Sequence, residues 1–212
     1  MGKDYEKVKK TAHEVLDIVI PRLAEEYDLE LHKPGLSVSI MDYMSEAGLF
    51  IPVGDYGLIK LQEESCSNKL TCCAVASHEM GHAGVYQNSP FYPELYKENQ
   101  DFHILEEGIS EKFIKTGLKI LKDEKYISNS DFYLQSLNIS VCGNLKEFFF
   151  PDKYIIGEMI VNYYSKRGIR IKDIIMRPEE FEEDLKKNWK KMVKPHSMPS
   201  IKFWEAITKA LL

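Results

Sequence analysis

The segment HEMGH, residues 78–82, contains side chains that could hold and use a metal ion. On a helix, His78 and His82 lie on one face about one turn apart, so both imidazoles can bind one zinc at about 2.0–2.1 Å. Glu79 lies roughly 100° further around the helix, where it can stand beside the metal without binding it. There it could take a proton from water whose pKa the metal lowers to about 7. The segment therefore predicts a hydrolytic zinc site with Glu79 as general base and acid.

A catalytic zinc needs a third protein ligand, which HExxH does not supply. The continuation HExxHxxGxxH is excluded, because Val85 and Asn88 stand where that pattern has Gly and His. An aspartate ligand is not favoured either, since Asp101 is an isolated acid. The remaining candidate is a glutamate in the segment LEEGISEKF, residues 105–113, on a second predicted helix.

Two neighbouring acids in this segment, Glu106 and Glu107, compete for the role of third ligand. Glu107 is preferred because its helical face also carries a mostly apolar stripe with Ile104, Ile114 and Leu118. An acid on such a stripe is most easily explained by a metal. Glu106 remains the alternative.

The pair of motifs, HEMGH and Glu107-Gly108-Ile109-Ser110-Glu111, resembles those of the gluzincins, the thermolysin-like and aminopeptidase-like zinc peptidases. The resemblance covers roughly residues 36–120. It implies a zincin-like fold, one zinc held by His78, His82 and Glu107, and a peptide or protein substrate. It also implies that Glu111 accepts the N–H of a ligand histidine, although thermolysin-like enzymes use Asp there.

The resemblance further implies a donor for the anionic oxygen of the tetrahedral intermediate, supplied by a Tyr or His of the C-terminal half. Tyr154 is the preferred candidate. The alternatives are Tyr163, Tyr164 and His196, while His103, one turn before Glu107, is expected to be an ordinary surface histidine.

Hydrophobic spacing predicts the elements that must position these residues. A helix is expected over 4–28, with Pro21 kinking or dividing it, and the HEMGH helix begins near 69, capped by Ser67 or Asn68. Further helices are expected at 101–122, 131–137, 152–167, 179–192 and 200–211. Three strands are expected at 36–41, 49–53 and 57–62.

The predicted fold is α+β and zincin-like, with a small antiparallel sheet, an active-site helix and a helical C-terminal half. Residues 1–90 are expected to form an N-terminal subdomain with the HEMGH helix, and residues 91–212 a helical subdomain with the glutamate ligand. An edge strand beside the helix, GLIKLQ (57–62) or LFIPV (49–53), could pair with an extended peptide. Gly157 would allow its helix to approach a neighbour closely.

The chain also resembles the short archaeal minigluzincins, which are compact single-domain relatives. This resemblance implies a latent enzyme, whose cleft is blocked by a segment of its own chain or by self-association. Residues 194–212 begin with a turn-rich stretch and end in an apolar stripe. The segment could dock on the core or could cover the cleft.

Bulk composition narrows the remaining classes of function. The chain has 212 residues, 44% hydrophobic and 29% charged, with a net charge of −5, so no basic field indicates nucleic acid. No apolar run is long enough to span a membrane. The charged N-terminus lacks a signal peptide's apolar core, which predicts a cytoplasmic protein. Cys66, Cys72, Cys73 and Cys142 are therefore expected to be free thiols.

A catalytically silent zinc scaffold or partner-binding module is the alternative function. The intact Glu79 argues against it, since a purely structural site has no use for a base. A chance motif in a protein that binds no metal is the remaining alternative.

Overall fold

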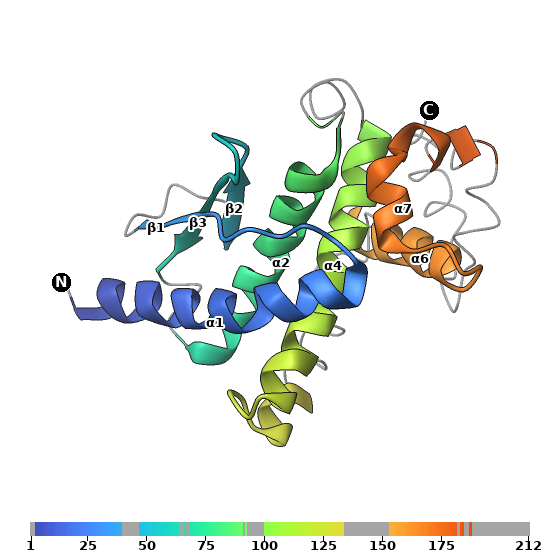
Figure 1. Cartoon of the computed structure of the whole chain (residues 1–212). Helices are drawn as coiled ribbons and strands as arrows, with labels where there is room; N and C mark the ends of the chain where they lie inside the picture. The colour runs from blue at the N-terminus through green and yellow to red at the C-terminus, as the bar shows by residue number, and fades with distance from the viewer. Residues whose placement is uncertain are drawn as a thin grey trace, which may run out of the picture. The chain divides into compact units, whose positions relative to one another are not determined.

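The structure of the chain is a computed structural model, which describes residues 3–39, 47–63, 66, 68–90, 92, 100–133, 153–181, 183, 184 and 187. Its helices and strands in chain order are α1 (Lys3–Tyr27), β1 (Gly35–Ser39), β2 (Gly48–Ile51), β3 (Leu58–Gln62), α2 (Lys69–Asn88), α4 (Gln100–Asp123), α6 (Lys153–Ser165) and α7 (Ile171–Met176) (Figure 1). The fold is α+β, mainly helical with a small three-stranded sheet, as the sequence predicts.

The long helices fall within a few residues of their predicted positions, because each has a clear helical repeat of apolar residues. Pro21 lies inside α1, which continues as one helix to Tyr27 and is not divided there. The short helix α7 has no counterpart in the prediction. The predicted helix at 200–211 lies outside the described residues.

The sheet differs from the prediction of an antiparallel sheet. Its strand order is β1-β3-β2, and β3 pairs antiparallel with β2 but parallel with β1. Alternation of apolar and polar residues shows which side chains face the core, but it does not set the direction of the neighbouring strand. Because β3 is the central strand, GLIKLQ does not offer a free edge, whereas β2 from the LFIPV segment lies at an edge.

The chain divides into two compact units, and α4 contributes to both. Unit 1 comprises Met1–Asn88 and Ser110–Leu137, and unit 2 comprises Ser89–Ile109 and Asn138–Leu212. The subdomains predicted from the sequence, residues 1–90 and 91–212, stay a prediction.

In unit 1, α2 is the central element, since α1 and two strands of the sheet, β2 and β3, all pack against it (Figure 1). Most of α2 is buried, including the apolar Cys72, Ala76, Met80 and Ala83. The last turn of α1 packs against α4 through Tyr27, whose ring stacks on that of Phe113 with centroids 4.9 Å apart. The Tyr27 hydroxyl donates to the carbonyl of Lys112 at 3.3 Å.

Close contact between α2 and α4 depends on small residues. A Cβ atom at Gly81 would lie 2.5 Å from the Cα of Ser110, a distance that two backbones can reach only when one residue is glycine. One turn earlier on α2, the side chain of Ser77 packs against Gly117, where an added Cβ would lie 2.5 Å from the Ser77 Oγ. The two helices therefore meet at backbone distance within unit 1.

In unit 2, the first half of α4 meets α6 at a pair of glycines. A Cβ at Gly108 would overlap the carbonyl oxygen of Gly157, so the two helices touch through their backbones. This confirms the close approach that the sequence predicts for Gly157. In the last turn of α6, Tyr164 is buried and donates to the carbonyl of Phe181 at 3.2 Å.

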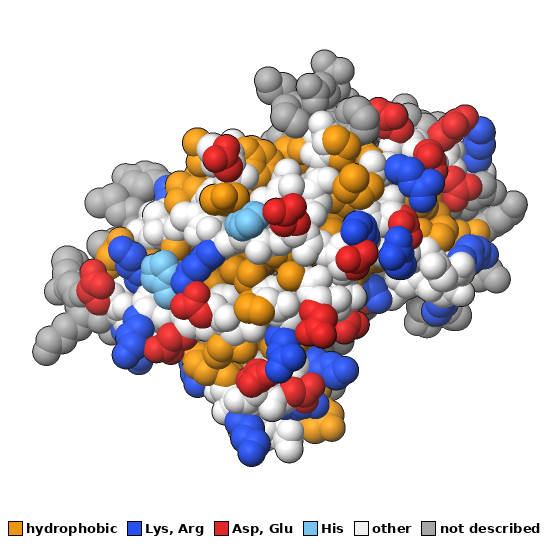
Figure 2. All heavy atoms as spheres, in the orientation of Figure 1, with side chains coloured by type: hydrophobic (Ala, Val, Ile, Leu, Met, Phe, Trp, Pro, Cys, Tyr) orange, Lys and Arg blue, Asp and Glu red, His pale blue; other side chains and the backbone are white. Residues whose placement is uncertain are grey.

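The surface carries charges of both signs. On the face shown in Figure 2, Lys and Arg side chains are interspersed with Asp and Glu over the described part of the chain. None of the described helices is both apolar enough and long enough to cross a membrane.

Candidate metal centre

Both histidines of the HEMGH segment come from α2, whose first turn is capped as the sequence predicts. The side chain of Asn68 accepts the backbone N–H of Thr71 at 2.8 Å. One helical turn apart, His78 and His82 direct their Nε2 atoms at each other, 3.1 Å apart. Two ligands of a tetrahedral zinc, each about 2.0–2.1 Å from the ion, are about 3.3 Å apart. The pair is therefore spaced to share one ion.

The third residue of the cluster is Glu107, on α4. His78, His82 and Glu107 each offer one ligand atom, and these atoms all lie within 4.8 Å of one another. Glu107 is placed by a helix that continues without a break to Ser110, and Ser110 packs against Gly81 on α2. The three residues are thus positioned to hold a metal ion.

The donor set itself supports this conclusion. Two imidazoles and one carboxylate are the ligands of a common type of catalytic zinc site. Glu107 is only 6% exposed, and a buried carboxylate needs hydrogen bonds and pairing with a cation to offset its lost hydration. A divalent cation between the three side chains would provide that pairing. The residues therefore fit a zinc ion.

Glu111 lies against one of the two histidines. Its carboxylate Oε1 is 3.5 Å from Nδ1 of His78, while Nε2 of the same ring faces His82. An acid beside Nδ1 favours the tautomer with the proton on Nδ1, which leaves Nε2 able to bind a metal. Glu111 stands one turn after Glu107 on α4, so one helix supplies a ligand and the acid that orients another.

Glu79 is 4% exposed and lies beneath the edge strand of the sheet. A Cβ at Gly48, the first residue of β2, would lie 2.6 Å from Oε1 of Glu79 and 2.7 Å from Cγ1 of Val75. Only glycine allows the strand to pass so close to this carboxylate. The backbone of β2 is thereby held directly beside Glu79.

Glu106, the alternative ligand, does not belong to the cluster of potential ligands found among the described residues. It is 2% exposed, and Tyr92 donates to its Oε1 at 2.9 Å. Its other oxygen, Oε2, lies 3.6 Å from Nδ1 of His103. Sequence reasoning placed His103 at the surface and missed this pairing, although the spacing of residues 103 and 106 on one helix permits it.

The predicted donor for the anionic oxygen stays a prediction. Tyr154 belongs to α6, but its side chain lies outside the described residues, as does His196. Tyr164 is engaged in packing, because its hydroxyl donates to Asp184 at 3.1 Å as well as to Phe181. The ring of Tyr163 is covered by the guanidinium of Arg167.

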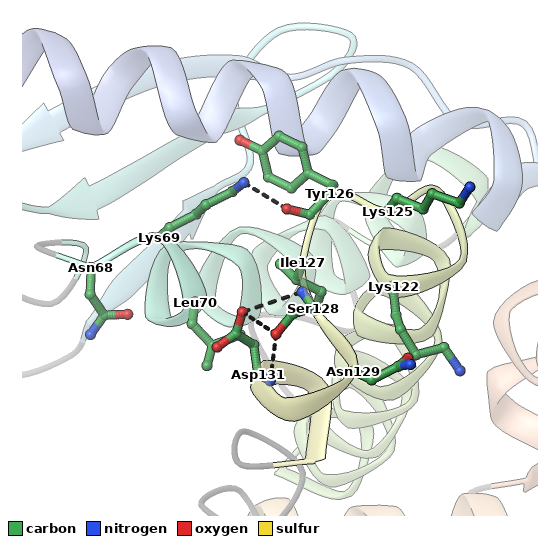
Figure 3. A pocket seen from close by; sticks show the side chains of 10 residues that line it. All are labelled: Asn68, Lys69, Leu70, Lys122, Lys125, Tyr126, Ile127, Ser128, Asn129 and Asp131. Atoms are coloured by element: carbon green, nitrogen blue, oxygen red, sulfur yellow. Dashed lines mark hydrogen bonds between the residues drawn. The ribbon is translucent and has the colours of Figure 1, made fainter.

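A separate surface cavity of about 710 Å³ lies where the start of α2 meets residues 122–131 (Figure 3). Its polar groups serve the local fold. Ser128 and Asp131 exchange hydrogen bonds in a capping arrangement at the start of a helical turn, and Lys69 donates to the carbonyl of Tyr126 at 2.6 Å. None of the three potential metal ligands lines this cavity.

Three cysteines in unit 1 are buried free thiols, in agreement with the sequence: Cys66, Cys72 and Cys73. Burial raises the pKa of the Cys73 thiol to about 12, which keeps it neutral. Cys142 lies outside the described residues.

Comparisons of the chain with known protein families, with curated proteins and with solved structures found no match. The interpretation of the site therefore depends on its own geometry.

Proposed function

We propose that the protein is a zinc-dependent peptidase of the gluzincin type. The observation that carries the proposal is the cluster of His78, His82 and Glu107, whose ligand atoms lie within 4.8 Å of one another. A zinc bound there would polarise a peptide carbonyl and make water a nucleophile near neutral pH. The metal would be held by these three residues, with Glu111 orienting His78.

Glu79 would move the proton in this reaction. A general base has to lie beside the attacking water without being a metal ligand, and Glu79 is the neighbour of His78 that is absent from the ligand cluster. In the proposed reaction, its carboxylate takes a proton from the attacking water and gives it to the leaving amine. Its burial at 4% exposure keeps bulk water from competing for that proton.

The edge strand β2 supports a peptide as the substrate. It forms one border of the sheet and runs beside Glu79 at Gly48. An extended peptide added to this edge would form backbone hydrogen bonds with β2, which hold the chain with little demand on its side chains. Its scissile bond would then lie close to the base.

A catalytically silent zinc scaffold is the competing function. Structural zinc sites usually have four protein ligands, whereas the cluster found within the described residues has three. A fourth position is where substrate and water would bind in a catalytic site. The number of protein ligands therefore favours the peptidase. Measurement of peptide hydrolysis separates the peptidase from the scaffold.

The test combines metal analysis with hydrolysis of a fluorogenic peptide library. Purified protein should contain about one zinc per chain, and His78→Ala or His82→Ala should lose it. Glu79→Gln should keep the zinc and lower hydrolysis by roughly two to four orders of magnitude, because only the proton transfer is removed.

A folded protein without zinc would overturn the proposal completely. Zinc retained without turnover in the wild type would favour the scaffold. If Glu79→Gln cleaves peptides as fast as the wild type, another group is the base.

A further inference from the structure

Two of the three buried cysteines of unit 1, Cys66 and Cys72, lie against each other. Cys66 is 3% exposed and Cys72 is 0% exposed, and the thiol of Cys66 donates a hydrogen bond to the sulfur of Cys72. Both are free thiols. The proposed peptidase reaction uses neither of them, and no cysteine belongs to the cluster of potential metal ligands found among the described residues.

Backbone hydrogen bonds hold the two cysteines on neighbouring elements. The N–H of Cys66 donates to the carbonyls of Gln62 at 3.1 Å and Glu63 at 3.2 Å, in the turn that follows β3. The N–H of Cys72 donates to the carbonyl of Asn68 at 3.1 Å, in the first turn of α2. The pair therefore forms where the chain passes from β3 to α2, wholly within unit 1.

Contact between two thiols is the first requirement for a disulfide. The bond places the sulfur atoms about 2.05 Å apart and the Cβ atoms about 3.5–4.5 Å apart. Thiols that already share a hydrogen bond have to approach only slightly to reach this geometry. Because both cysteines are held by the backbone of their own elements, the contact is a lasting feature of the fold.

The hydrogen bond also makes the two sulfurs unequal. By donating to Cys72, Cys66 lowers the pKa of the Cys72 thiol, although burial opposes this change, and the same bond raises the pKa of Cys66. The thiolate is the nucleophilic form of cysteine, so an oxidant reacts first with Cys72. Burial raises the pKa of the neighbouring Cys73 to about 12, which keeps that thiol protonated.

We propose that Cys66 and Cys72 are a redox-active dithiol, which a peroxide converts into a disulfide between the turn after β3 and the first turn of α2. The sulfur of Cys72 attacks one oxygen of hydrogen peroxide, forms an S–O bond and releases water, which gives a sulfenic acid. The sulfur of Cys66 then attacks that of Cys72, the S–O bond breaks, and the oxygen leaves with the Cys66 proton as a second water. Both sulfurs are oxidised, and both oxygens of the peroxide are reduced to water.

A trypsin site between the two cysteines, at Lys69, makes the disulfide directly detectable. Native protein is treated with hydrogen peroxide, its remaining thiols are blocked with iodoacetamide in urea, and the tryptic digest is analysed by mass spectrometry without reduction. A disulfide should join the peptides 61–69 and 70–97, with a mass lower than their sum by two hydrogen atoms. Dithiothreitol should separate the two peptides again. Cys73→Ser is the matched control and should form the same linked pair.

Two further variants test the order of the steps. Cys66→Ser removes the second thiol, so the sulfenic acid of Cys72 should persist and react with dimedone. Cys72→Ser should give about tenfold less dimedone adduct, because the thiol that remains at Cys66 lacks a lowered pKa. If either variant folds poorly by circular dichroism, fragmentation of the linked peptides from the wild type still decides whether Cys72 or Cys73 is the partner.

The outcomes are independent of zinc and of peptide hydrolysis. A linked pair that forms in native wild type and in Cys73→Ser, and is absent from Cys66→Ser and Cys72→Ser, supports the dithiol. Wild-type protein that forms no linked pair, or forms it only after unfolding in urea, would overturn the inference. A link that fragmentation assigns to Cys73 would overturn it as well.

Discussion

Adjacent residues of α4 have different partners although they have the same chemistry. Glu107 belongs to the metal cluster, whereas Glu106 is held by Tyr92 and His103. A helix turns by 100° per residue, so two neighbouring acids cannot face the same group. The choice between them could be predicted from the apolar stripe that Glu107 shares.

Substitution of the two acids should therefore affect zinc very differently. Glu107→Ala is expected to weaken zinc binding by more than about 100-fold, because loss of a ligand exceeds the 10–100-fold cost of losing an orienting partner. Glu106→Ala should change zinc affinity by less than about tenfold. Competition with a fluorescent zinc chelator measures both, and equal losses or the reverse order would move the ligand to Glu106.

Helical spacing makes it possible to predict which side chains near the site share one face of a helix. The interval of four places His78 and His82 on one face of α2, and the same interval places Glu107 and Glu111 on one face of α4. The partner of Glu106 could not be predicted, because Tyr92 lies outside α4 and sequence spacing does not describe that contact.

At the scale of elements, the contact between α2 and α4 determines how closely the ligands can meet. Gly81→Ala would place a methyl group 2.5 Å from the Cα of Ser110, and backbone atoms cannot yield as a flexible side chain can. We expect a loss of about 1–3 kcal/mol in the free energy of unfolding, typical of overpacking, together with weaker zinc binding as the helices separate.

Gly84→Ala on the same helix is the matched control. Its new methyl group would meet side-chain atoms of Leu31 and Phe113 at 3.2 Å, and alanine also favours the helix by up to about 1 kcal/mol. Urea unfolding and zinc competition on both variants provide the comparison. A Gly81→Ala protein as stable as Gly84→Ala would show that the helices do not need this contact.

Tyr27, which joins α1 to α4, should make the free energy of unfolding depend on pH in the alkaline range. Burial raises the pKa of Tyr27 from 10.0 to about 12, although its hydrogen bond with Thr116 partly opposes the shift. Below pH 10 the phenol is neutral in both the folded and the unfolded state. Between pH 10 and 12 it ionises mainly in the unfolded state, so the stability that it contributes is lost as the pH rises through this range.

Tyr27→Phe keeps the stacking on Phe113 and removes this titration. Urea midpoints measured from pH 9 to 12 should therefore fall less steeply in Tyr27→Phe than in the wild type. Cys73 is retained in both proteins, so its own titration cancels in the comparison. Parallel curves for the two proteins would contradict the prediction.

The elements themselves illustrate what sequence patterns specify. The helices were predictable because a repeat of 3.6 residues identifies both their presence and their buried face. The strands were also found, but their pairing was not, because the position of β3 between β1 and β2 depends on contacts between distant segments. That difference matters for the site, since it makes β2 the edge strand beside Glu79.

At the scale of the whole molecule, the proposed zinc joins segments that lie far apart in the sequence. Metal that binds only the folded state stabilises it, by about 2.7 kcal/mol when free zinc is at 100 times its Kd. Thermal unfolding should therefore shift upward with added zinc and return with a chelator. His78→Ala should show no shift, and His32→Ala should behave as the wild type.

A zinc-dependent shift of equal size in His78→Ala would mean that the stabilising metal binds elsewhere. The division predicted from the sequence, with a boundary between residues 90 and 91, stays a prediction. In the structure α4 crosses from unit 2 into unit 1 between Ile109 and Ser110, and a continuous helix gives no sequence mark at such a crossing.

That uninterrupted helix also limits how the gene can change. The interval from Glu107 to Glu111 is one turn long, so inserting or deleting a single codon there would rotate one acid by about 100° relative to the other. Such a change would separate the ligand from the acid that orients His78, even if every remaining residue were preserved. Related genes that retain the centre are therefore expected to align through this interval without gaps, and to vary in length only in the segments that connect the helices.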